Sequence, residues 1–98
     1  MFSAYNMPLF SLLTPNDIQQ QLAQTVRAKR KQLKLSRQAL AERSTVPAST
    51  IKKFETTAQI SLRQFILLWQ SVDSLENLAE LCKDSQAVPS SIDEVLKG

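Results

Sequence analysis

The chain has 98 residues, of which 43% are hydrophobic, and its formal net charge is +3 at pH 7. A chain of this length holds one domain with a small core and leaves little room for a deep catalytic cleft. The single cysteine, Cys82, excludes a disulfide framework within one chain, and the absence of histidine excludes Cys/His zinc sites and the usual general base. We expect Cys82 to be a buried helix residue.

Residues 1–13 form an apolar segment that contains the aromatic residues Phe2, Tyr5 and Phe10. The segment has no basic leader and Pro8 interrupts its apolar run, so it does not predict a secretory signal. No stretch of the chain is long and apolar enough to span a bilayer, and we expect a cytoplasmic protein without membrane association. We interpret the segment as an arm that packs over its own core, packs across a dimer axis or docks as a strand on another protein.

A helix is predicted to begin after Thr14, where Pro15 suits the first helical turn and Asp17 completes a capping box. Its predicted apolar face consists of Ile18, Leu22 and Val26. Their spacing is that of one side of an α-helix.

Two short helices are predicted between residues 35 and 55, with only a few residues between them. Ser36 is the expected cap of the first, and Pro47 pre-sets the backbone for the second. The residues expected to face inward are Ala39, Leu40, the stem of Arg43, Val46, Ile51 and Phe54. Two helices joined so tightly must cross steeply, which is the helix-turn-helix geometry that offers its second helix to a DNA major groove.

The charges of the chain are segregated. Residues 27–53 contain nine basic residues and one acid, Glu42, so this region carries +8 while the rest of the chain carries −5. A solvated helix face is the simplest source of a basic run, but this block coincides with the two predicted helices. The coincidence favours contact with DNA phosphates, and the split suggests a second, different partner.

A further helix is predicted after Ser61, which forms a capping box with Gln64. Its predicted inward residues are Leu62, Phe65, Ile66, Trp69 and Val72. Leu67 and Leu68 lie outside that stripe, and they indicate either a wider core or a dimer interface.

The end of the chain holds two more amphipathic stretches. A short helix is predicted over residues 75–82, with inward residues Leu75, Leu78, Ala79 and Cys82. After a polar stretch and Pro89, a serine cap precedes an apolar strip formed by Ile92, Val95 and Leu96. So short a helix is marginal alone, so we expect it to dock on another surface.

The middle of the chain, residues 18–72, resembles the Cro/C1-type (XRE) helix-turn-helix family. The residues that match its pattern are Val26, Arg27, Arg30, Leu35, Ser36, Leu40, Ala41, Val46, Ser49, Ile51, Phe54 and Glu55. The resemblance implies a compact five-helix, all-α domain in which Ala41 lets the two short helices approach. It also implies a structural ion pair between Arg30 and Glu55.

Two departures from the family pattern affect the turns. Arg37 stands where the family usually has glutamine, and the glycines usual near Lys34, Thr45 and Thr57 are absent. We expect Lys or Thr to adopt the left-handed conformation at helix ends, at a cost of about 1 kcal/mol each, or the turns to take another form.

The tail resembles that of HipB-like antitoxins, which are encoded beside HipA-type kinases. The chain is then divided into an arm (1–13), a helix-turn-helix domain (14–83) and a tail (84–98). The resemblance implies a homodimer that represses its own operon and binds a HipA-like serine/threonine kinase toxin, with or without a further small protein, through Ile92, Val95 and Leu96. The alternatives are a phage-type or stand-alone repressor, and an interaction module that has lost DNA binding.

The helix-turn-helix interpretation assigns roles to exposed residues. Ala48, Ser49 and Lys52 are expected to contact base edges, and Lys34, Arg37, Lys53 and Arg63 to contact phosphates. Leu67 and Leu68 are candidates for the dimer interface. No nucleophile with a base, phosphate-binding glycine loop or metal cluster is recognised, so we expect neither enzymatic activity nor a cofactor.

Overall fold

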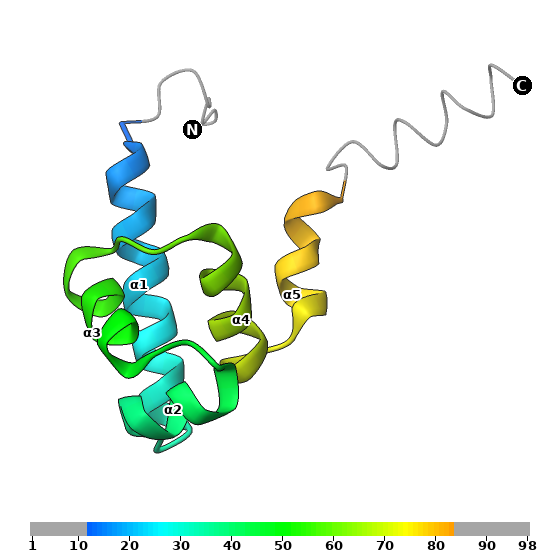
Figure 1. Cartoon of the computed structure of the whole chain (residues 1–98). Coiled ribbons are helices and arrows are strands. Elements are labelled where there is room, and N and C mark those ends of the chain that lie inside the picture. The colour runs from blue at the N-terminus through cyan, green and yellow to red at the C-terminus, as the bar shows by residue number, and fades with distance from the viewer. Residues whose placement is uncertain (1–11, 84–98) are drawn as a thin grey trace, which may run out of the picture.

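The computed structural model describes residues 12–83, and these residues are all-helical, with no strand (Figure 1). The elements are α1 (Pro15–Gln32), α2 (Arg37–Ser44), α3 (Ala48–Thr57), α4 (Leu62–Val72), α5 (Leu75–Ala79) and the short 3-10 helix η2 (Glu80–Cys82). The all-α expectation is therefore confirmed for this part of the chain. The interpretations of the arm before Leu12 and of the tail strip Ile92, Val95 and Leu96 concern residues outside it.

The helices are arranged around α1, the longest of them (Figure 1). α3 lies on one side of α1 and α4 on the other, while α2 lies near the C-terminal end of α1 and packs against both α3 and α4. α5 lies outside α4 and packs against it. The core is thus enclosed by α1 to α4, and α5 covers one side only.

Four helix starts follow the capping signals in the sequence. The Thr14 hydroxyl accepts a hydrogen bond from the Asp17 amide, and the Asp17 carboxylate accepts one from the Thr14 amide, so the predicted capping box is present. Ser36, Ser61 and Ser74 each cap the helix that follows. At Ser61 only one half of the expected capping box is present. The Ser61 hydroxyl accepts a hydrogen bond from the Gln64 amide, but the side-chain oxygen of Gln64 accepts its bond from the Ser61 hydroxyl.

The core confirms Leu40, Val46, Ile51 and Phe54 among the predicted inward residues of the two short helices and their turn, while Ala39 is only half-buried. Its fully buried large side chains are Val26, Leu40, Val46, Ile51, Phe54 and Leu68. Phe65 meets Phe54 edge to face, with ring centroids 6.0 Å apart. Arg43 is exposed, so the expectation that its stem packs inward is wrong.

The inward face of α4 differs from the predicted one. Leu68 has no exposed surface, whereas Leu62 is 74% exposed. Phe65, Leu68 and Val72 form the buried stripe at i, i+3 and i+7, because α1 and α2 pack against a side of α4 that includes Leu68, which was predicted to lie outside the buried stripe. Of the two interpretations of Leu67 and Leu68, the wider core is correct for Leu68 and the dimer interface is wrong for it, while Leu67 is half-buried beside the core.

Four other expected core positions lie at the surface: Ile18, Leu75, Ala79 and Cys82. Ile18 is 41% exposed, because the buried side of α1 runs through Ala23, Val26 and Arg30 further along the helix. Cys82 and Ala79 are exposed, because α5 and η2 pack on one neighbour only. The prediction of a buried Cys82 is wrong.

Within residues 12–83, three non-glycine residues adopt the left-handed conformation at helix ends. Lys34 has φ 60°, Thr45 φ 65° and Ala58 φ 65°. The first two lie where the missing glycines predicted them. The third is Ala58 rather than Thr57, because α3 extends through Thr57.

Candidate functional site

The connection between α2 and α3 is short and internally bonded. Thr45 closes α2 by donating its amide to the Ala41 carbonyl at 2.8 Å, and its hydroxyl bonds the Ser44 carbonyl. The buried Ser44 hydroxyl accepts a hydrogen bond from the Val46 amide at 3.1 Å. Val46 is 1% exposed and fixes the turn to the core. Pro47 then precedes the first residue of α3, so this helix starts at a defined point in the fold.

α3 is divided into a buried and an exposed side. Ile51, Phe54 and the side chain of Glu55 face the interior, each no more than 2% exposed. Ser49 and Lys52 are exposed and three residues apart, which places them on one side of the helix. Ala48, the first residue of the helix, is half-buried. The outward side therefore presents polar and basic side chains. The buried side chains of the inward side fix the orientation of the helix.

The other basic residues assigned to phosphates are also at the surface. Lys34, Lys53 and Arg63 are exposed, and no ion pair of the described residues involves them or Lys52. Lys34 lies just after the C-terminal end of α1 and Lys53 is on α3, while Arg63 is in the first turn of α4. Their charges are thus available to an anionic partner.

The ion pair implied by the family resemblance is present. Arg30 donates to both carboxylate oxygens of Glu55, from Nε to Oε2 at 2.7 Å and from Nη2 to Oε1 at 2.9 Å. Its third nitrogen, Nη1, donates to the Leu35 carbonyl at 2.8 Å. Arg30 is 7% exposed and the Glu55 side chain 1% exposed, so this bidentate pair is buried between α1 and α3.

Two more arginines approach the same carboxylate, which sequence reasoning missed. Arg37 Nε donates to Glu55 Oε1 at 3.0 Å, and Arg27 Nε lies 3.9 Å from that oxygen. Burial raises the pKa of Glu55, but the hydrogen bonds and charges of Arg30 and Arg37 outweigh burial and lower the pKa below its ordinary value. Three guanidinium groups share one carboxylate, which leaves two positive charges in excess.

The position of Arg37 changes its expected role. It was predicted as a free phosphate contact, but its Nε is occupied by Glu55, and its side chain is only 33% exposed. This contact could have been inferred from the sequence at Arg37 itself. It is a basic residue in the first position of the helix after Ser36, where the family that the chain resembles usually has glutamine. Arg37 therefore links α2 to α3 as well as adding positive charge near the surface.

A second polar cluster joins α1 to the start of α5. Lys29 Nζ lies 2.8 Å from Asp73 Oδ2 and 5.5 Å from the centroid of the Trp69 ring. Trp69 Nε1 donates to the Ser74 carbonyl, and Asp73 Oδ1 accepts from Asn77 Nδ2. Hydrogen bonds from Lys29, the Ser74 amide and Asn77 lower the pKa of Asp73 to about 2.

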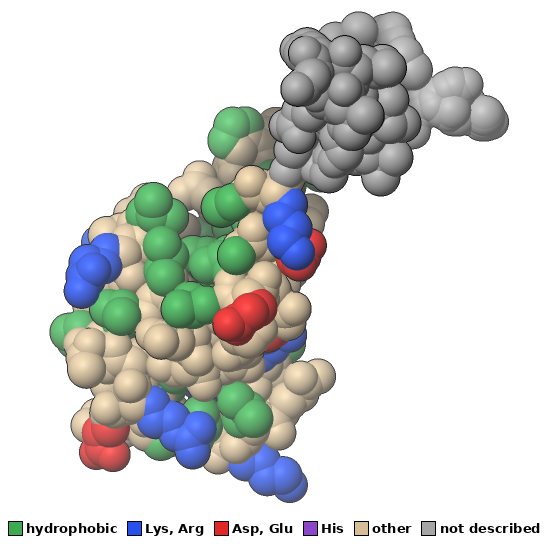
Figure 2. Space-filling view, turned by 90° about the vertical axis from the view of Figure 1, so that its right-hand side faces the viewer, with side chains coloured by type: hydrophobic (Ala, Val, Ile, Leu, Met, Phe, Trp, Pro, Cys, Tyr) green, Lys and Arg blue, Asp and Glu red, His purple; other side chains and the backbone are tan. Residues whose placement is uncertain are grey.

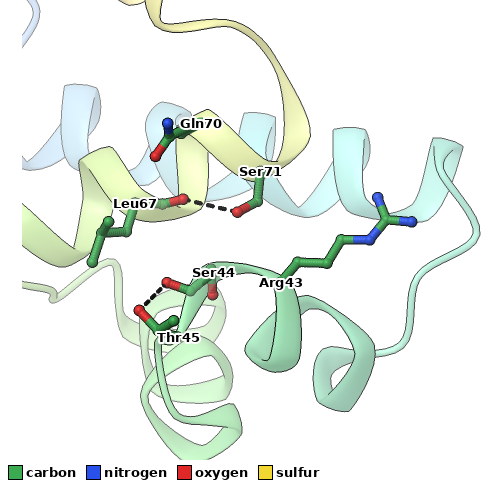
Figure 3. Close-up of a pocket in the computed structure, with 6 residues that line it drawn as sticks. All are labelled: Arg43, Ser44, Thr45, Leu67, Gln70 and Ser71. Atoms are coloured by element: carbon green, nitrogen blue, oxygen red, sulfur yellow. Dashed lines mark hydrogen bonds between the residues drawn. The ribbon is translucent and has the colours of Figure 1, made fainter.

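A cleft lies between α2 and α4 (Figure 3). It has a volume of about 420 Å³ and is lined by Arg43, Ser44, Thr45, Leu67, Gln70 and Ser71. The Ser71 hydroxyl donates a hydrogen bond to the Leu67 carbonyl at 3.0 Å. The Arg43 side chain extends along one side of the opening. Its lining contains no carboxylate and one charged group, so it offers no acid and base pair.

Comparisons with protein-family models, with curated proteins and with solved structures found no match to this chain. Over residues 12–83, no group of three or more His, Cys, Asp or Glu side chains is placed to hold a metal ion. No helix in that range is both long and apolar enough to cross a membrane.

Proposed function

We propose that the chain is a sequence-specific DNA-binding protein in which α2, the turn at residues 45–47 and α3 act as a helix-turn-helix. The observation that carries this proposal is the division of α3. Its inward side is fixed by Ile51, Phe54 and the buried Glu55, while Ser49 and Lys52 project from the other side directly after the turn. A helix inserted into a major groove needs such a fixed axis and an exposed first turn.

In this proposal, Ala48, Ser49 and Lys52 face base edges. Ala48 can contact only a thymine methyl group and Ser49 hydrogen-bonds without strong preference, so Lys52 carries most of the direct readout by contacting guanine O6 or N7. Lys34, Lys53 and Arg63 contact phosphates. Arg37 contributes through the excess charge of the Glu55 cluster and through the position of α2.

The proposal is tested by titrating the protein against duplex DNA from the region upstream of its own gene and against a scrambled duplex. Ser49→Glu places a negative charge on the proposed DNA side of α3 and should abolish the preference for the native duplex. Asn16→Glu adds the same charge in the exposed first turn of α1 and should leave binding unchanged. Equal effects of the two variants, or equal binding of both duplexes by the unmodified protein, would reject this function.

We further propose that the protein is a homodimer that represses its own operon and binds a HipA-like kinase. This part is supported by the resemblance of the tail, and by an apolar surface that a partner could cover. Figure 2 shows hydrophobic side chains gathered over the face formed by α4 and α5. Exposed members of these elements and of η2 include Leu62, Leu75 and Leu81, and Leu67 of α4 is half-buried.

Removal of residues 84–98 separates the two activities. The truncated protein should keep its affinity for the upstream duplex, because the deletion removes none of the exposed basic residues assigned to DNA. It should lose co-purification with the kinase encoded beside it, because Ile92, Val95 and Leu96 are removed. If no kinase co-purifies with the full chain while the chain binds the DNA upstream of its own gene, a stand-alone repressor is the correct interpretation.

A further inference from the structure

An apolar groove lies at the end of α3 that is remote from the turn. It has a volume of about 220 Å³ and is lined by Leu22 of α1, Phe54 and Ala58 at the end of α3, and Ile60, Leu62 and Phe65 around the start of α4. Phe54 and Ala58 form a buried floor, being 2% and 4% exposed. None of the residues between 12 and 83 that line the groove is charged, so it is unsuited to a nucleic acid or an acidic peptide.

The rim of the groove exposes large apolar side chains. Leu62, on the rim, is 74% exposed, and Ile18, one turn before Leu22 on α1, is 41% exposed. Leu12 and Leu13, which lead into α1, are 92% and 59% exposed. Apolar surface therefore continues from the groove toward the point where the chain enters α1, and covering it would remove that surface from water.

We propose that residues 1–11 of the same chain occupy this groove. Their chemistry matches it, because none of their side chains is charged and six of them are large and apolar or aromatic: Met1, Phe2, Tyr5, Met7, Leu9 and Phe10. An aromatic side chain of this segment fills the space above Phe54 and Ala58. This proposal is independent of DNA binding and chooses one of the three interpretations of the arm.

The length of the segment permits this placement. Gln19, which also lines the groove, follows Thr14 by five residues, so it lies about 7.5 Å along the axis of α1 at 1.5 Å per residue. Eleven extended residues span at most about 36 Å. The segment can therefore turn back beside the first turns of α1 and reach the groove with its last five or six residues.

The C-terminal tail is a poorer match. It continues from η2, which follows α5, and α5 lies on the far side of α4 from α1 and α3 (Figure 1). The tail also carries three acids, Asp84, Asp93 and Glu94, for which the groove has no cationic partner. An arm in the groove would cover the last turn of α3 and the chain that joins it to α4, and so would stabilise the helix proposed to read DNA.

The proposal is tested by paramagnetic broadening in the full chain. Cys82, which is exposed, is replaced by Ser so that a single cysteine can be introduced elsewhere. In this background, Ser3→Cys carries a nitroxide label on the arm, and Ser90→Cys carries the same label on the tail as a matched control. Amide signals are recorded with the label oxidised and reduced. A further variant, Phe10→Asp, places a charge in the segment and tests whether the broadening depends on its apolar side chains.

The arm label should remove signal from Leu22, Ile60 and Leu62 and leave Leu40 and Leu78 unaffected, and Phe10→Asp should restore the lost signal. The tail label should leave the groove signals intact. Absence of broadening at the groove, or broadening from the tail label instead, overturns the proposal. A mixture of isotope-labelled chain without nitroxide and unlabelled chain with nitroxide identifies a second copy: broadening of the groove signals in this mixture would show that the arm is exchanged between chains, which also overturns the proposal.

Discussion

Lys29 and Arg30 are consecutive residues of α1, and their charged groups hold different parts of the fold. Lys29 pairs with Asp73 at the start of α5, while Arg30 pairs with Glu55 on α3. One turn of α1 therefore holds both α3, the helix proposed to read DNA, and α5. Loss of the pair of Lys29 with Asp73 should affect α5 more than α3, and loss of the pair of Arg30 with Glu55 should affect α3 more than α5.

Removal of the Glu55 carboxylate should destabilise the fold strongly. Glu55→Ala leaves Arg30 buried without a counter-charge and deprives Arg37 of its acceptor, so the free energy of unfolding should fall by about 3 kcal/mol. Urea denaturation followed by circular dichroism measures this change. Glu42→Ala, at an exposed position of α2, is the control and should change stability by less than about 0.5 kcal/mol. A loss for Glu55→Ala as small as that of the control would contradict the buried pair.

The Asp73 cluster should make stability depend on pH in acid. Its pKa is lowered from 3.8 to about 2 in the folded protein, so its contribution is present above pH 3.8 and is lost as the pH falls toward 2. Asp73→Asn should flatten the stability curve in this window. Trp69, the single tryptophan, contacts the cluster and provides a fluorescence signal for the measurement. Glu76→Gln, at an exposed position of α5, should leave the curve as it is; a curve unaltered by Asp73→Asn would show that the cluster does not stabilise the fold.

Lys52 should contribute to sequence preference. Lys52→Ala should weaken binding to the native duplex by about 1–3 kcal/mol and relax the choice of base at one position, because a contact to a base edge is lost. Titrations on duplexes varied one base pair at a time measure both effects. Lys83→Ala, directly after η2, removes an exposed lysine far along the chain from α3 and serves as the control. An equal loss on native and scrambled duplexes would make Lys52 a phosphate contact instead.

Lys53 and Arg37 should differ in how they affect DNA binding. Lys53→Ala removes one exposed and unpaired charge, so it should weaken all sequences alike and reduce the slope of log K against log salt by about one without altering stability. Arg37→Ala should weaken binding and also lower the unfolding free energy, because Arg37 is bonded to Glu55. Measured melting temperatures that are equal for the two variants would argue against a structural role of Arg37.

Lys34 should show opposite effects on stability and on DNA binding. Its φ of 60° suits glycine better than lysine, so Lys34→Gly should stabilise the fold by up to about 1 kcal/mol while it removes a proposed phosphate contact. Lys31→Gly is the matched change inside the last turn of α1 and should destabilise by about 1 kcal/mol. A destabilised Lys34→Gly protein would show that the left-handed conformation carries no strain there.

The starts of α1, α2 and α4 were predictable because short-range capping determines them, at Thr14, Ser36 and Ser61. The buried side of α4 was not, since nearly every residue from Phe65 to Trp69 is apolar and the helical period alone cannot choose between two stripes. Tertiary packing made that choice when it buried Leu68.

The candidate site was predictable to a similar extent. The surface position of Ser49 and Lys52 follows from the helical period once Ile51 and Phe54 face inward. The ion pair of Arg30 with Glu55 was expected from a family resemblance alone. The contact of Arg37 with Glu55 was not expected, because it joins residues 18 positions apart and depends on how α2 lies against α3.

The division of α3 has a consequence for how such a protein could change its target. Ser49 and Lys52 make no contribution to the buried core, and Glu55 is satisfied entirely by arginines of α1 and α2. Substitutions at the two exposed positions can therefore accumulate with little effect on folding. Duplicated copies of this domain could acquire different operators while the scaffold stays the same, and selection experiments that randomise these two positions alone should return folded proteins at high frequency.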